Sequence, residues 1–302
     1  MDSKTVFVSI VGRPNAGKSS LLNAMVGEKV AIVSDKPQTT RTKITGILTK
    51  DGTQYVFIDT PGIHKAKTKL GEHMMKAVKD SVSEIDVIVF VADATKKFGE
   101  NEAEFLESFK KSKIPVILVL NKIDLIEEKE NLLKIIDEAS RLYEFEAIIP
   151  VSVLENDGIE LVLNEISKLA VESPHFFPDD MLTDQPERVI AAEIVREKFL
   201  HLLSEEIPHG IAVTVEEMKE RKDKNGNDIL DISANIFCEK DSHKGIIIGK
   251  NGDMLKKAGS LSRQDMEDFF GIKVNLQLWV KVKPDWRNKE GMIKNFGLAN
   301  SK

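Results

Sequence analysis

The sequence has a single cysteine and no long apolar run, and both absences narrow the kind of protein it encodes. Cys238 is the only cysteine among 302 residues, so neither an intramolecular disulfide nor a thiolate-based zinc site can form. We interpret Cys238, which follows Ile236 and Phe237, as a small buried hydrophobe. No apolar run reaches 18 residues, and the run after Thr5 is too short for a signal peptide. We expect a cytoplasmic protein with at most peripheral membrane contact.

The excess of charge of one sign is also small. The chain has 43 Lys and Arg against 49 Asp and Glu, a net charge of −6. This balance speaks against a disordered chain and, taken over the whole chain, against a nucleic-acid partner. The two ends differ, however, because residues 1–180 hold 23 basic and 29 acidic residues, whereas residues 240–302 hold 13 and 7. The C-terminal end is therefore basic enough for a polyanionic partner.

The first half of the chain alternates short β-branched runs with helical stretches. The runs are Val6–Val11, Tyr55–Ile58, Val87–Ala92, Val116–Leu120 and Ile148–Val151. Amphipathic segments at Glu102–Lys111 and Glu130–Tyr143 lie between them. This alternation predicts an α/β domain over residues 1–172, with a mostly parallel sheet covered by helices on both faces.

A proline-rich break at residues 173–186 predicts an interdomain linker. A helix is expected from 187 to about 206, followed by two alternating runs, Ile211–Glu220 and Ile229–Phe237. Asn225-Gly226 between them is a strong hairpin signal. A glycine-rich turn, two helices, the strand Lys273–Val282 and a short basic helix complete the pattern. Residues 187–302 are therefore predicted to form an α+β domain in the order α-β-β-α-α-β-α.

A phosphate-binding loop follows the first predicted strand. The segment from Gly12 to Ser19, Gly-Arg-Pro-Asn-Ala-Gly-Lys-Ser, fits G-x-x-x-x-G-K-[ST], and a helix is expected at Ser20–Met25. Backbone N–H groups of such a loop wrap phosphates at a helix N-terminus. Lys18 would bridge the β- and γ-phosphates, and the Ser19 hydroxyl would ligate Mg²⁺. The predicted nucleotide contacts here are Gly12, Asn15, Ala16, Gly17, Lys18, Ser19 and Ser20.

The ends of three later strands supply the remaining candidate residues. Asp59-Thr60-Pro61-Gly62 would place Asp59 near Mg²⁺ through water and offer the Gly62 N–H to the γ-phosphate. In Asn121-Lys122-Ile123-Asp124, the Asp124 carboxylate can accept two hydrogen bonds from guanine, a donor pair that adenine lacks. Lys122 would pack over the base, and backbone at Ser152-Val153 would support the guanine O6. These four elements in this order resemble the translation-factor class of P-loop GTPases.

Two threonines compete for the last magnesium ligand. In Pro37-Gln38-Thr39-Thr40-Arg41, a switch threonine should ligate Mg²⁺ and sense the γ-phosphate. The related pattern Thr-Thr-Arg places it just before the arginine, so we choose Thr40 and leave Thr39 as the alternative. The predicted metal ligands are Ser19, Thr40 and Asp59.

The residue after Gly62 is Ile63, which cannot orient water as the glutamine of many GTPases does. Asn15 in G-x-P-N-x-G-K-S resembles the subclass whose hydrolysis is helped by bound K⁺, which would neutralise developing charge. The alternative is that Asn15 is only a turn residue. The residues predicted to support hydrolysis are Asn15, Lys18, Thr40 and Gly62.

A second glycine loop lies in the C-terminal half. G-x-x-G at 249–252, with Ile-Ile-Ile-Gly ahead and a helix behind, resembles the KH domain, and the element order matches the second of its two topologies. The resemblance implies that the glycines let RNA approach, that Lys250 meets a phosphate, and that an isoleucine wall lies under the bases. Trp286 either stacks on a base or packs against the last helix. The predicted RNA contacts are Gly245, Ile246, Ile247, Ile248, Gly249, Lys250, Asn251 and Gly252.

A P-loop GTPase joined to a KH domain of this topology resembles the Era family of bacterial GTPases over nearly the whole chain. The resemblance implies Mg²⁺-dependent GTP hydrolysis, binding of GTP and GDP, and binding of small-subunit ribosomal RNA near its 3′ end during small-subunit assembly. It also implies peripheral inner-membrane contact, and we expect the protein to be a monomer. We expect GTP to order Thr40 and so to change RNA binding. Two alternatives stay open: a C-terminal domain that binds protein, and an inert nucleotide domain.

Overall fold

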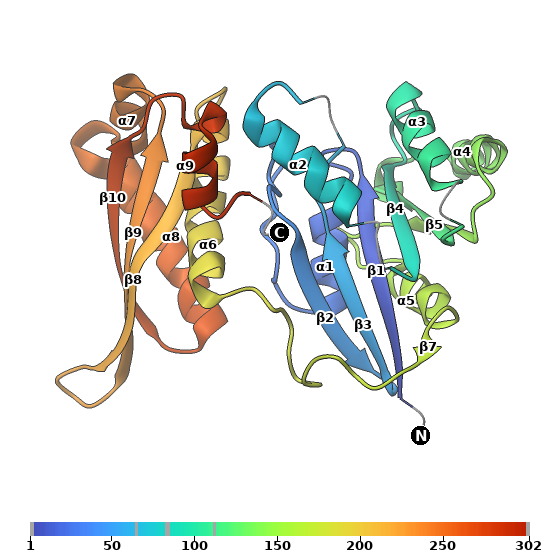
Figure 1. Cartoon of the computed structure of the whole chain (residues 1–302), viewed down its shortest axis with the longest axis horizontal. Coiled ribbons are helices and arrows are strands. Elements are labelled where there is room, and N and C mark those ends of the chain that lie inside the picture. Colours follow the sequence, from blue (N-terminus) through green and yellow to red (C-terminus); the bar gives the residue numbers. More distant parts are fainter. Residues whose placement is uncertain (1–2, 64–65, 82–84, 111–112, 300–302) are drawn as a thin grey trace. The chain divides into compact units, whose positions relative to one another are not determined.

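The computed structural model describes residues 3–63, 66–81, 85–110 and 113–299. Contacts group the chain into two compact units, which are coloured along the sequence in Figure 1. The first unit comprises residues 1–31, 40–66 and 71–184, and the second comprises residues 32–39, 67–70 and 185–302. Among the described residues, no helix is both long enough and apolar enough to cross a bilayer.

The first unit is built on one sheet with the strand order β2-β3-β1-β4-β5-β6, and the short β7 pairs with β1. Its strands are β1 Lys4–Gly12, β2 Ile44–Lys50, β3 Thr53–Asp59, β4 Val87–Asp93, β5 Val116–Asn121, β6 Ala147–Val151 and β7 Val171–Glu172. The pairs of β1 with β3 and β4, of β4 with β5, and of β5 with β6 are parallel, whereas β2 and β7 are antiparallel edges. The predicted mostly parallel sheet is confirmed, and β2 is a strand that the sequence analysis missed.

Helices cover both faces of this sheet, as predicted (Figure 1). They are α1 Lys18–Val26, α2 Lys69–Asp80, α3 Glu100–Phe109, α4 Lys129–Leu142 and α5 Ile159–Ser167. Leu21 of α1 and Ile166 of α5 pack with Val8 in one core, while Leu106 of α3 and Phe90 belong to the core on the other face. The predicted helix Glu102–Lys111 corresponds to α3, and Lys111 lies outside the described residues.

The parallel strands determine where functional residues can meet. β1, β3 and β5 all run in the same direction. The phosphate loop follows β1, Asp59 ends β3 and Asn121 ends β5. Their carboxyl ends therefore deliver residues that are far apart in sequence to a single edge of the sheet, which is where ligands bind in open α/β sheets.

The segment predicted to be a linker makes specific contacts within the first unit. Gln54 is completely buried in β3. Its Oε1 accepts hydrogen bonds from the backbone nitrogens of Phe176 (2.8 Å) and Phe177 (3.0 Å), and its Nε2 donates to the Phe177 carbonyl oxygen at 2.9 Å. Ile47 N donates to the Leu182 carbonyl oxygen at 2.8 Å. Residues 173–184 thus lie along β2 and β3 as part of this unit.

The second unit has the predicted order α-β-β-α-α-β-α. Its elements are α6 Glu187–Leu202, β8 Ala212–Lys222, β9 Asp228–Cys238, α7 Asp241–Ile248, α8 Asp253–Phe270, β10 Lys273–Val282 and α9 Glu290–Asn295. The sheet order is β10-β9-β8, with β8 and β9 antiparallel and β9 and β10 parallel. The predicted Asn225-Gly226 turn joins β8 to β9, and Gly226 has a φ of 87°. Val195 and Phe199 of α6 share a core with Ala258 and Met266 of α8.

Candidate functional site

The loop between β1 and α1 has a backbone that its glycines make possible. Gly12 has a φ of 151°, and a Cβ there would lie 2.2 Å from the carbonyl oxygen of Val91. Gly17 has a φ of 98°, and a Cβ there would lie 2.1 Å from Nδ2 of Asn121. Asn15 between them is also left-handed, with a φ of 63°. Left-handed residues in a turn before a helix gather N–H groups into an anion-binding concavity.

Lys18 is a buried ammonium at the start of α1. Its Nζ donates to the carbonyl oxygen of Arg13 at 3.0 Å. Burial lowers the pKa of Lys18, and the nearby Asp59 carboxylate partly opposes this shift. A buried cation costs free energy unless an anion neutralises it. The loop and Lys18 together therefore suit a polyanionic ligand such as a chain of phosphates.

A cluster of oxygen ligands lies next to the loop. Ser19 Oγ donates to Asp59 Oδ2 at 2.6 Å, and it lies 2.9 Å from Thr40 Oγ1, which is itself 3.3 Å from Asp59 Oδ2. Among the described residues, the other Asp59 oxygen, Oδ1, is buried and has no hydrogen-bond partner. Burial also raises the pKa of Asp59. Two hydroxyls and a carboxylate with an unused oxygen fit Mg²⁺, a hard cation that takes few protein ligands.

The structure distinguishes the two candidate threonines. Thr40 is buried and contacts both other members of the oxygen cluster. The Thr39 hydroxyl donates instead to the carbonyl oxygen of Lys36 at 2.6 Å, within the second unit. This geometry favours Thr40 over Thr39 as the metal ligand.

The segment after β3 lies directly against the phosphate loop. A Cβ on Gly62 would lie 2.6 Å from the backbone nitrogen of Pro14, so a side chain has no room there. Ile63 N donates to the Gly12 carbonyl oxygen at 3.1 Å. The Ile63 side chain packs against the apolar core and has no atom that could orient water.

The predicted base-binding residues come together at the ends of β5 and β6. Asn121 Nδ2 donates to the Ala16 carbonyl oxygen at 2.9 Å, and Ser152 Oγ donates to Asp124 Oδ1 at 2.6 Å. Val153 N donates to Asn121 Oδ1 at 3.2 Å. Asn121 thus ties the phosphate loop to the Ser152 loop. The Val153 N–H, which was predicted to support the guanine O6, here donates to Asn121.

Sequence analysis missed Asp93, which ends β4. Its Oδ2 accepts from Lys122 Nζ at 2.8 Å, and its Oδ1 accepts from Thr95 Oγ1 at 2.6 Å. Burial raises the pKa of Asp93, but the hydrogen bonds from Lys122 and Thr95 outweigh it and hold that pKa below its usual value. The carboxylate therefore stays ionised and orients Lys122. Its place at a strand end, like that of Asp59, was the signal that could have found it.

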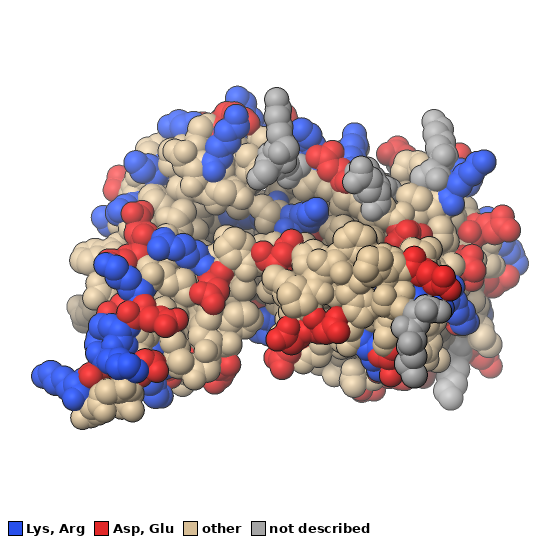
Figure 2. Space-filling view, turned by 60° about the horizontal axis from the view of Figure 1, so that its bottom comes forward, with Lys and Arg blue, Asp and Glu red and all other residues tan. Residues whose placement is uncertain are grey.

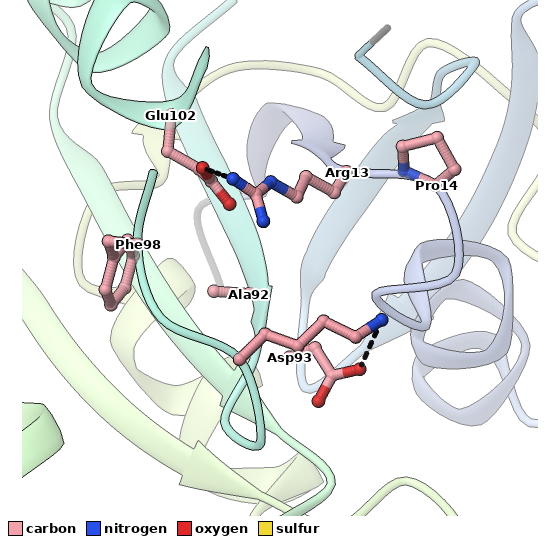
Figure 3. A pocket seen from close by; sticks show the side chains of 7 residues that line it. Arg13, Pro14, Ala92, Asp93, Phe98 and Glu102 are labelled. Atoms are coloured by element: carbon pink, nitrogen blue, oxygen red, sulfur yellow. Dashed lines mark hydrogen bonds and ion pairs between the residues drawn. The ribbon is translucent and has the colours of Figure 1, made fainter. Parts of the chain in front are cut away.

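Arg13 of the phosphate loop forms an ion pair with Glu102 of α3, and both side chains line a pocket of about 20 Å³ (Figure 3). Glu102 Oε2 also accepts from the Gly99 backbone nitrogen at 2.9 Å. A pocket of this volume holds about one water molecule. We interpret the ion pair as a contact that stabilises the loop conformation and not as a ligand site.

The second glycine loop, between α7 and α8, is more open than the first. Gly249 has a φ of 76°, and a Cβ there would lie 2.7 Å from Met254 Cβ. Asn251 and Gly252 are left-handed too, but a Cβ on Gly252 would meet nothing within 4 Å. Lys250 is exposed. A flexible chain can therefore reach the backbone of this loop closely.

The structure exposes a smaller apolar surface beside this loop than the three consecutive isoleucines predicted. Ile247 is completely buried in the core of the second unit, whereas Ile246 is 48% exposed. The cause is helical geometry, because residues 241–248 form α7 and successive side chains of a helix point about 100° apart. The apolar wall predicted from three isoleucines is therefore reduced to Ile246 and the half-buried Ile248.

A groove of about 430 Å³ begins at the glycine loop. Helix α8 contributes small and basic residues, and β10 contributes an apolar floor. Its lining residues are Gly252, Leu255, Lys256, Gly259, Ser260, Arg263, Leu276 and Leu278. A cationic rim over an apolar floor suits unstacked bases with their backbone along the rim. Most of these residues were missed because their meeting depends on the packing of α8 on β10.

Of the two roles predicted for Trp286, base stacking and packing inside the protein, the structure supports packing. It is completely buried, donates from Nε1 to the Gly210 carbonyl oxygen at 2.8 Å, and packs edge-on against Phe296. The exposed tryptophan is Trp279 of β10, at 58%. Figure 2 shows acidic and basic side chains interspersed over the visible face, so the basic excess does not form one continuous patch there.

Comparisons with known proteins agree on both units. The family model described as 50S ribosome-binding GTPase matches residues 7–122, and the KH domain model matches residues 206–287. GTPase Era of Ruminiclostridium cellulolyticum is 52% identical over 302 residues, covering 100% of both chains. GTPase Era of Clostridioides difficile is 53% identical over 294 residues, covering 97% of this chain and 98% of that protein.

Two solved structures are similar over nearly the full length. A crystal structure of Era in complex with MgGDPNP and nucleotides 1506–1542 of 16S ribosomal RNA is 41% identical, with a TM-score of 0.94, and the match covers 99% of this chain and 100% of that one. An Aquifex aeolicus Era variant bound to GDP·AlF4⁻ is 42% identical, also with a TM-score of 0.94, and the match covers 98% and 100%.

Proposed function

Because the chain belongs to the Era family of GTPases, we propose that it binds and hydrolyses GTP with Mg²⁺ and binds small-subunit ribosomal RNA near its 3′ end. We further propose that it acts in assembly of the small ribosomal subunit. The GTPase activity belongs to the first unit and RNA binding to the second.

The observation that supports the nucleotide site best is the cluster of Ser19, Thr40 and Asp59 beside buried Lys18. Asp59 Oδ1 is buried without a partner among the described residues, and burial lowers the pKa of Lys18 although Asp59 is close to it. A nucleotide with Mg²⁺ would satisfy both, because phosphates neutralise the ammonium and the cation neutralises the carboxylate. When bound, Mg²⁺ would withdraw charge from the β- and γ-phosphate oxygens. Ser19 and Thr40 would hold it directly, and Asp59 through water.

Specificity for guanine would come from Asp124, which accepts from Ser152 through one oxygen. Asn121 and Asp93 would act indirectly, by fixing the loop backbone and Lys122. For hydrolysis, Gly62 would meet the γ-phosphate through its N–H, and Thr40 would sense the same group. Ile63 cannot orient the attacking water, so we propose that Asn15 helps to hold K⁺ against the phosphates.

RNA binding is supported by the open loop at 249–252 and the groove between α8 and β10. Era in the solved complex holds nucleotides of 16S ribosomal RNA, and the KH match includes both the loop and the groove. Lys250 and the rim residues Lys256 and Arg263 would contact phosphates. The apolar floor at Leu276 and Leu278 would lie under the bases.

The nucleotide proposal is tested by measuring phosphate release from GTP and from ATP, with Mg²⁺ and with a chelator. We expect release from GTP only, and only with Mg²⁺. Equal turnover of ATP would contradict the role of Asp124. A protein that binds GTP without hydrolysing it would support the alternative of an inert nucleotide domain.

The RNA proposal is tested with Lys250→Glu. This change puts a negative charge where a phosphate should lie, so affinity for a 16S 3′-end fragment should fall roughly tenfold or more. Lys224→Glu makes the same charge change at the exposed β8–β9 turn and should alter affinity by less than about twofold. If both variants bind RNA like the parent, the second unit binds a protein or uses another surface.

From the family we also propose a cytoplasmic monomer that contacts the inner membrane only peripherally. Sedimentation of the purified protein should give the mass of one chain, 33.8 kDa. In fractionated cells, high salt should release any membrane-associated portion. Protein that stays in membranes after a salt wash would contradict this proposal.

A further inference from the structure

The segment of residues 32–39 precedes Thr40 in sequence but belongs to the second unit by its contacts. Helix α6 holds the main chain of this segment at both ends. Glu197 Oε1 accepts from the backbone nitrogen of Val33 at 2.9 Å, and His201 Nε2 hydrogen-bonds the Val33 carbonyl oxygen at 2.8 Å. At the other end, Arg196 Nη2 donates to the Thr39 carbonyl oxygen. Glu197 and His201 are four residues apart and lie on one face of the helix, and the adjacent Arg196 points about 100° away from Glu197.

Two of these side chains are charged and almost fully buried. Arg196 is 2% exposed and Glu197 is 3% exposed. Arg196 is held in place by Glu193, whose carboxylate accepts from its Nε at 2.8 Å and its Nη2 at 2.5 Å. Burying such charges carries a large desolvation penalty, and stabilisation by packing alone would favour apolar residues. The arrangement indicates a specific function for the groups that Arg196 and Glu197 bind.

The Thr39 carbonyl is one peptide bond from Thr40, and a peptide unit is planar. Fixing this carbonyl therefore fixes the direction in which the chain enters Thr40. The Thr40 hydroxyl lies 2.9 Å from Ser19 Oγ and 3.3 Å from Asp59 Oδ2. We propose that Arg196 and Glu197 of α6 are positioning residues that hold residues 32–39 so that Thr40 can complete the Mg²⁺·GTP site. This rests on the role proposed above for Thr40.

The same helix connects this function to RNA binding. Val195 and Phe199 of α6 pack in one core with Ala258 of α8, the helix that lines the RNA groove. Helix α6 therefore contacts both residues 32–39 and the core that supports α8. By thermodynamic reciprocity, RNA that favours the held state would also favour the GTP-bound state.

The test uses Arg196→Ala in the full chain, with Arg196→Lys as the conservative variant and Arg188→Ala as control. Arg188 lies on the same helix but is exposed, and its Nη1 donates to the Glu216 carbonyl oxygen at 3.1 Å. Affinities for a non-hydrolysable Mg²⁺·GTP analogue and for Mg²⁺·GDP are measured for each variant. We expect Arg196→Ala to weaken the analogue about tenfold and GDP less than twofold, because GDP lacks the γ-phosphate that Thr40 senses. Arg196→Lys should recover part of the loss, and Arg188→Ala should match the parent.

Equal weakening of analogue and GDP would indicate a purely structural role and overturn the proposal, as would unchanged affinity for both. If Arg196→Ala fails to fold, His201→Ala replaces it, because His201 is exposed and its loss should not unfold the protein. His201→Ala should selectively weaken the affinity for the analogue by about threefold, and equal effects on both nucleotides would again overturn the proposal.

Thr40→Ala distinguishes the proposed role of Thr40 from the proposed role of α6. If Thr40→Ala binds the analogue like the parent, the proposed role of Thr40 is wrong. If Thr40→Ala binds the analogue weakly while Arg196→Ala binds it like the parent, only the proposed role of α6 is wrong.

Discussion

The two glycine loops of this protein solve a similar problem in different ways. Each precedes a helix, contains left-handed residues and has one lysine. In the first loop, Lys18 is buried and a Cβ on Gly12 would overlap a backbone oxygen at 2.2 Å. In the second loop, Lys250 is exposed and a Cβ on Gly252 would meet nothing within 4 Å.

The burial of the lysine and the crowding of the backbone determine which ligand each loop can recognise. A buried lysine in a crowded backbone accepts one ligand in one geometry, because any misplaced phosphate would leave a desolvated charge unpaired. An exposed lysine on an open loop keeps its hydration and tolerates many positions of a flexible chain. The first loop is therefore suited to a nucleotide, and the second to an RNA backbone whose bases are recognised elsewhere.

Replacing the lysine of each loop with alanine should give the largest contrast. Lys18→Ala removes a preorganised charge from a buried site, so GTP hydrolysis should fall about 10³-fold. Lys250→Ala removes one solvated phosphate contact, so RNA affinity should fall less than about tenfold. Phosphate release and RNA anisotropy measure the two effects. Losses of equal size would erase the distinction between the loops.

Alanine at a glycine of each loop should affect folding unequally. Gly12→Ala forces an overlap with Val91, so the free energy of unfolding should fall by about 3 kcal/mol or more. Gly252→Ala adds only the cost of a left-handed alanine, about 1 kcal/mol. Far-UV circular dichroism measures both, while tryptophan fluorescence follows the second unit alone, since Trp279 and Trp286 are the only tryptophans. A Gly252→Ala protein as unstable as Gly12→Ala would contradict this prediction.

GTP hydrolysis at the first loop and RNA binding at the second should depend differently on whether the monovalent cation is K⁺ or Na⁺. GTP hydrolysis should be about tenfold faster in KCl than in NaCl at equal ionic strength, because K⁺ at Asn15 would neutralise developing charge. RNA binding should depend on ionic strength but not on which cation supplies it. Asn15→Ala should remove the KCl advantage. Equal hydrolysis rates in the two salts would show that Asn15 is only a turn residue.

The smallest expected effect is on the free energy of unfolding of the protein without nucleotide and Mg²⁺. Burial raises the pKa of Asp59 above its usual value in the folded state. Ionised Asp59 therefore destabilises the folded protein at neutral pH, and Asp59→Asn should stabilise the nucleotide-free, Mg²⁺-free chain by about 1 kcal/mol. The gain should vanish as the pH falls below the usual range of an aspartic acid, where both states are protonated.

Urea unfolding at pH 7 and pH 3 measures this gain. Asp253→Asn in the first turn of α8 is the matched control from the second loop, and it should lose slight stability because a carboxylate there favours the helix dipole. A destabilised Asp59→Asn protein at pH 7 would mean that the hydrogen bonds from Ser19 and Thr40 outweigh the burial of the charge.

Sequence alone predicted the features that are encoded locally. The phosphate loop, Asp59-Gly62 and Asn121-Asp124 are continuous motifs at strand ends, and the parallel sheet brings them together without further information. The α-β-β-α-α-β-α order was likewise readable from alternating hydrophobicity. The element order was confirmed, and the motifs lie at strand ends as expected, because each depends on residues within a few positions of one another.

What escaped prediction depends on contacts between distant segments. Asp93 meets Lys122 only because β4 and β5 are neighbours, and Arg196 meets Thr39 across 157 positions of sequence. The burial of Ile247 escaped prediction for a different reason, since an apolar run does not indicate which side chain of a short helix points into the core. Local pattern indicates that a segment is apolar or charged, whereas its partner is fixed by the assembled fold.

Gln54 determines where the chain can be cut to produce the first unit as a separate fragment. Its buried amide is satisfied by backbone of Phe176 and Phe177, both beyond the last strand of the first unit. A fragment ending at Glu172 would leave that amide without these partners, at a cost of about 1–3 kcal/mol for each unsatisfied group. A gene fragment meant to yield the nucleotide-binding unit should therefore extend to Asp184. The same boundary would govern any exchange of this module between proteins by recombination.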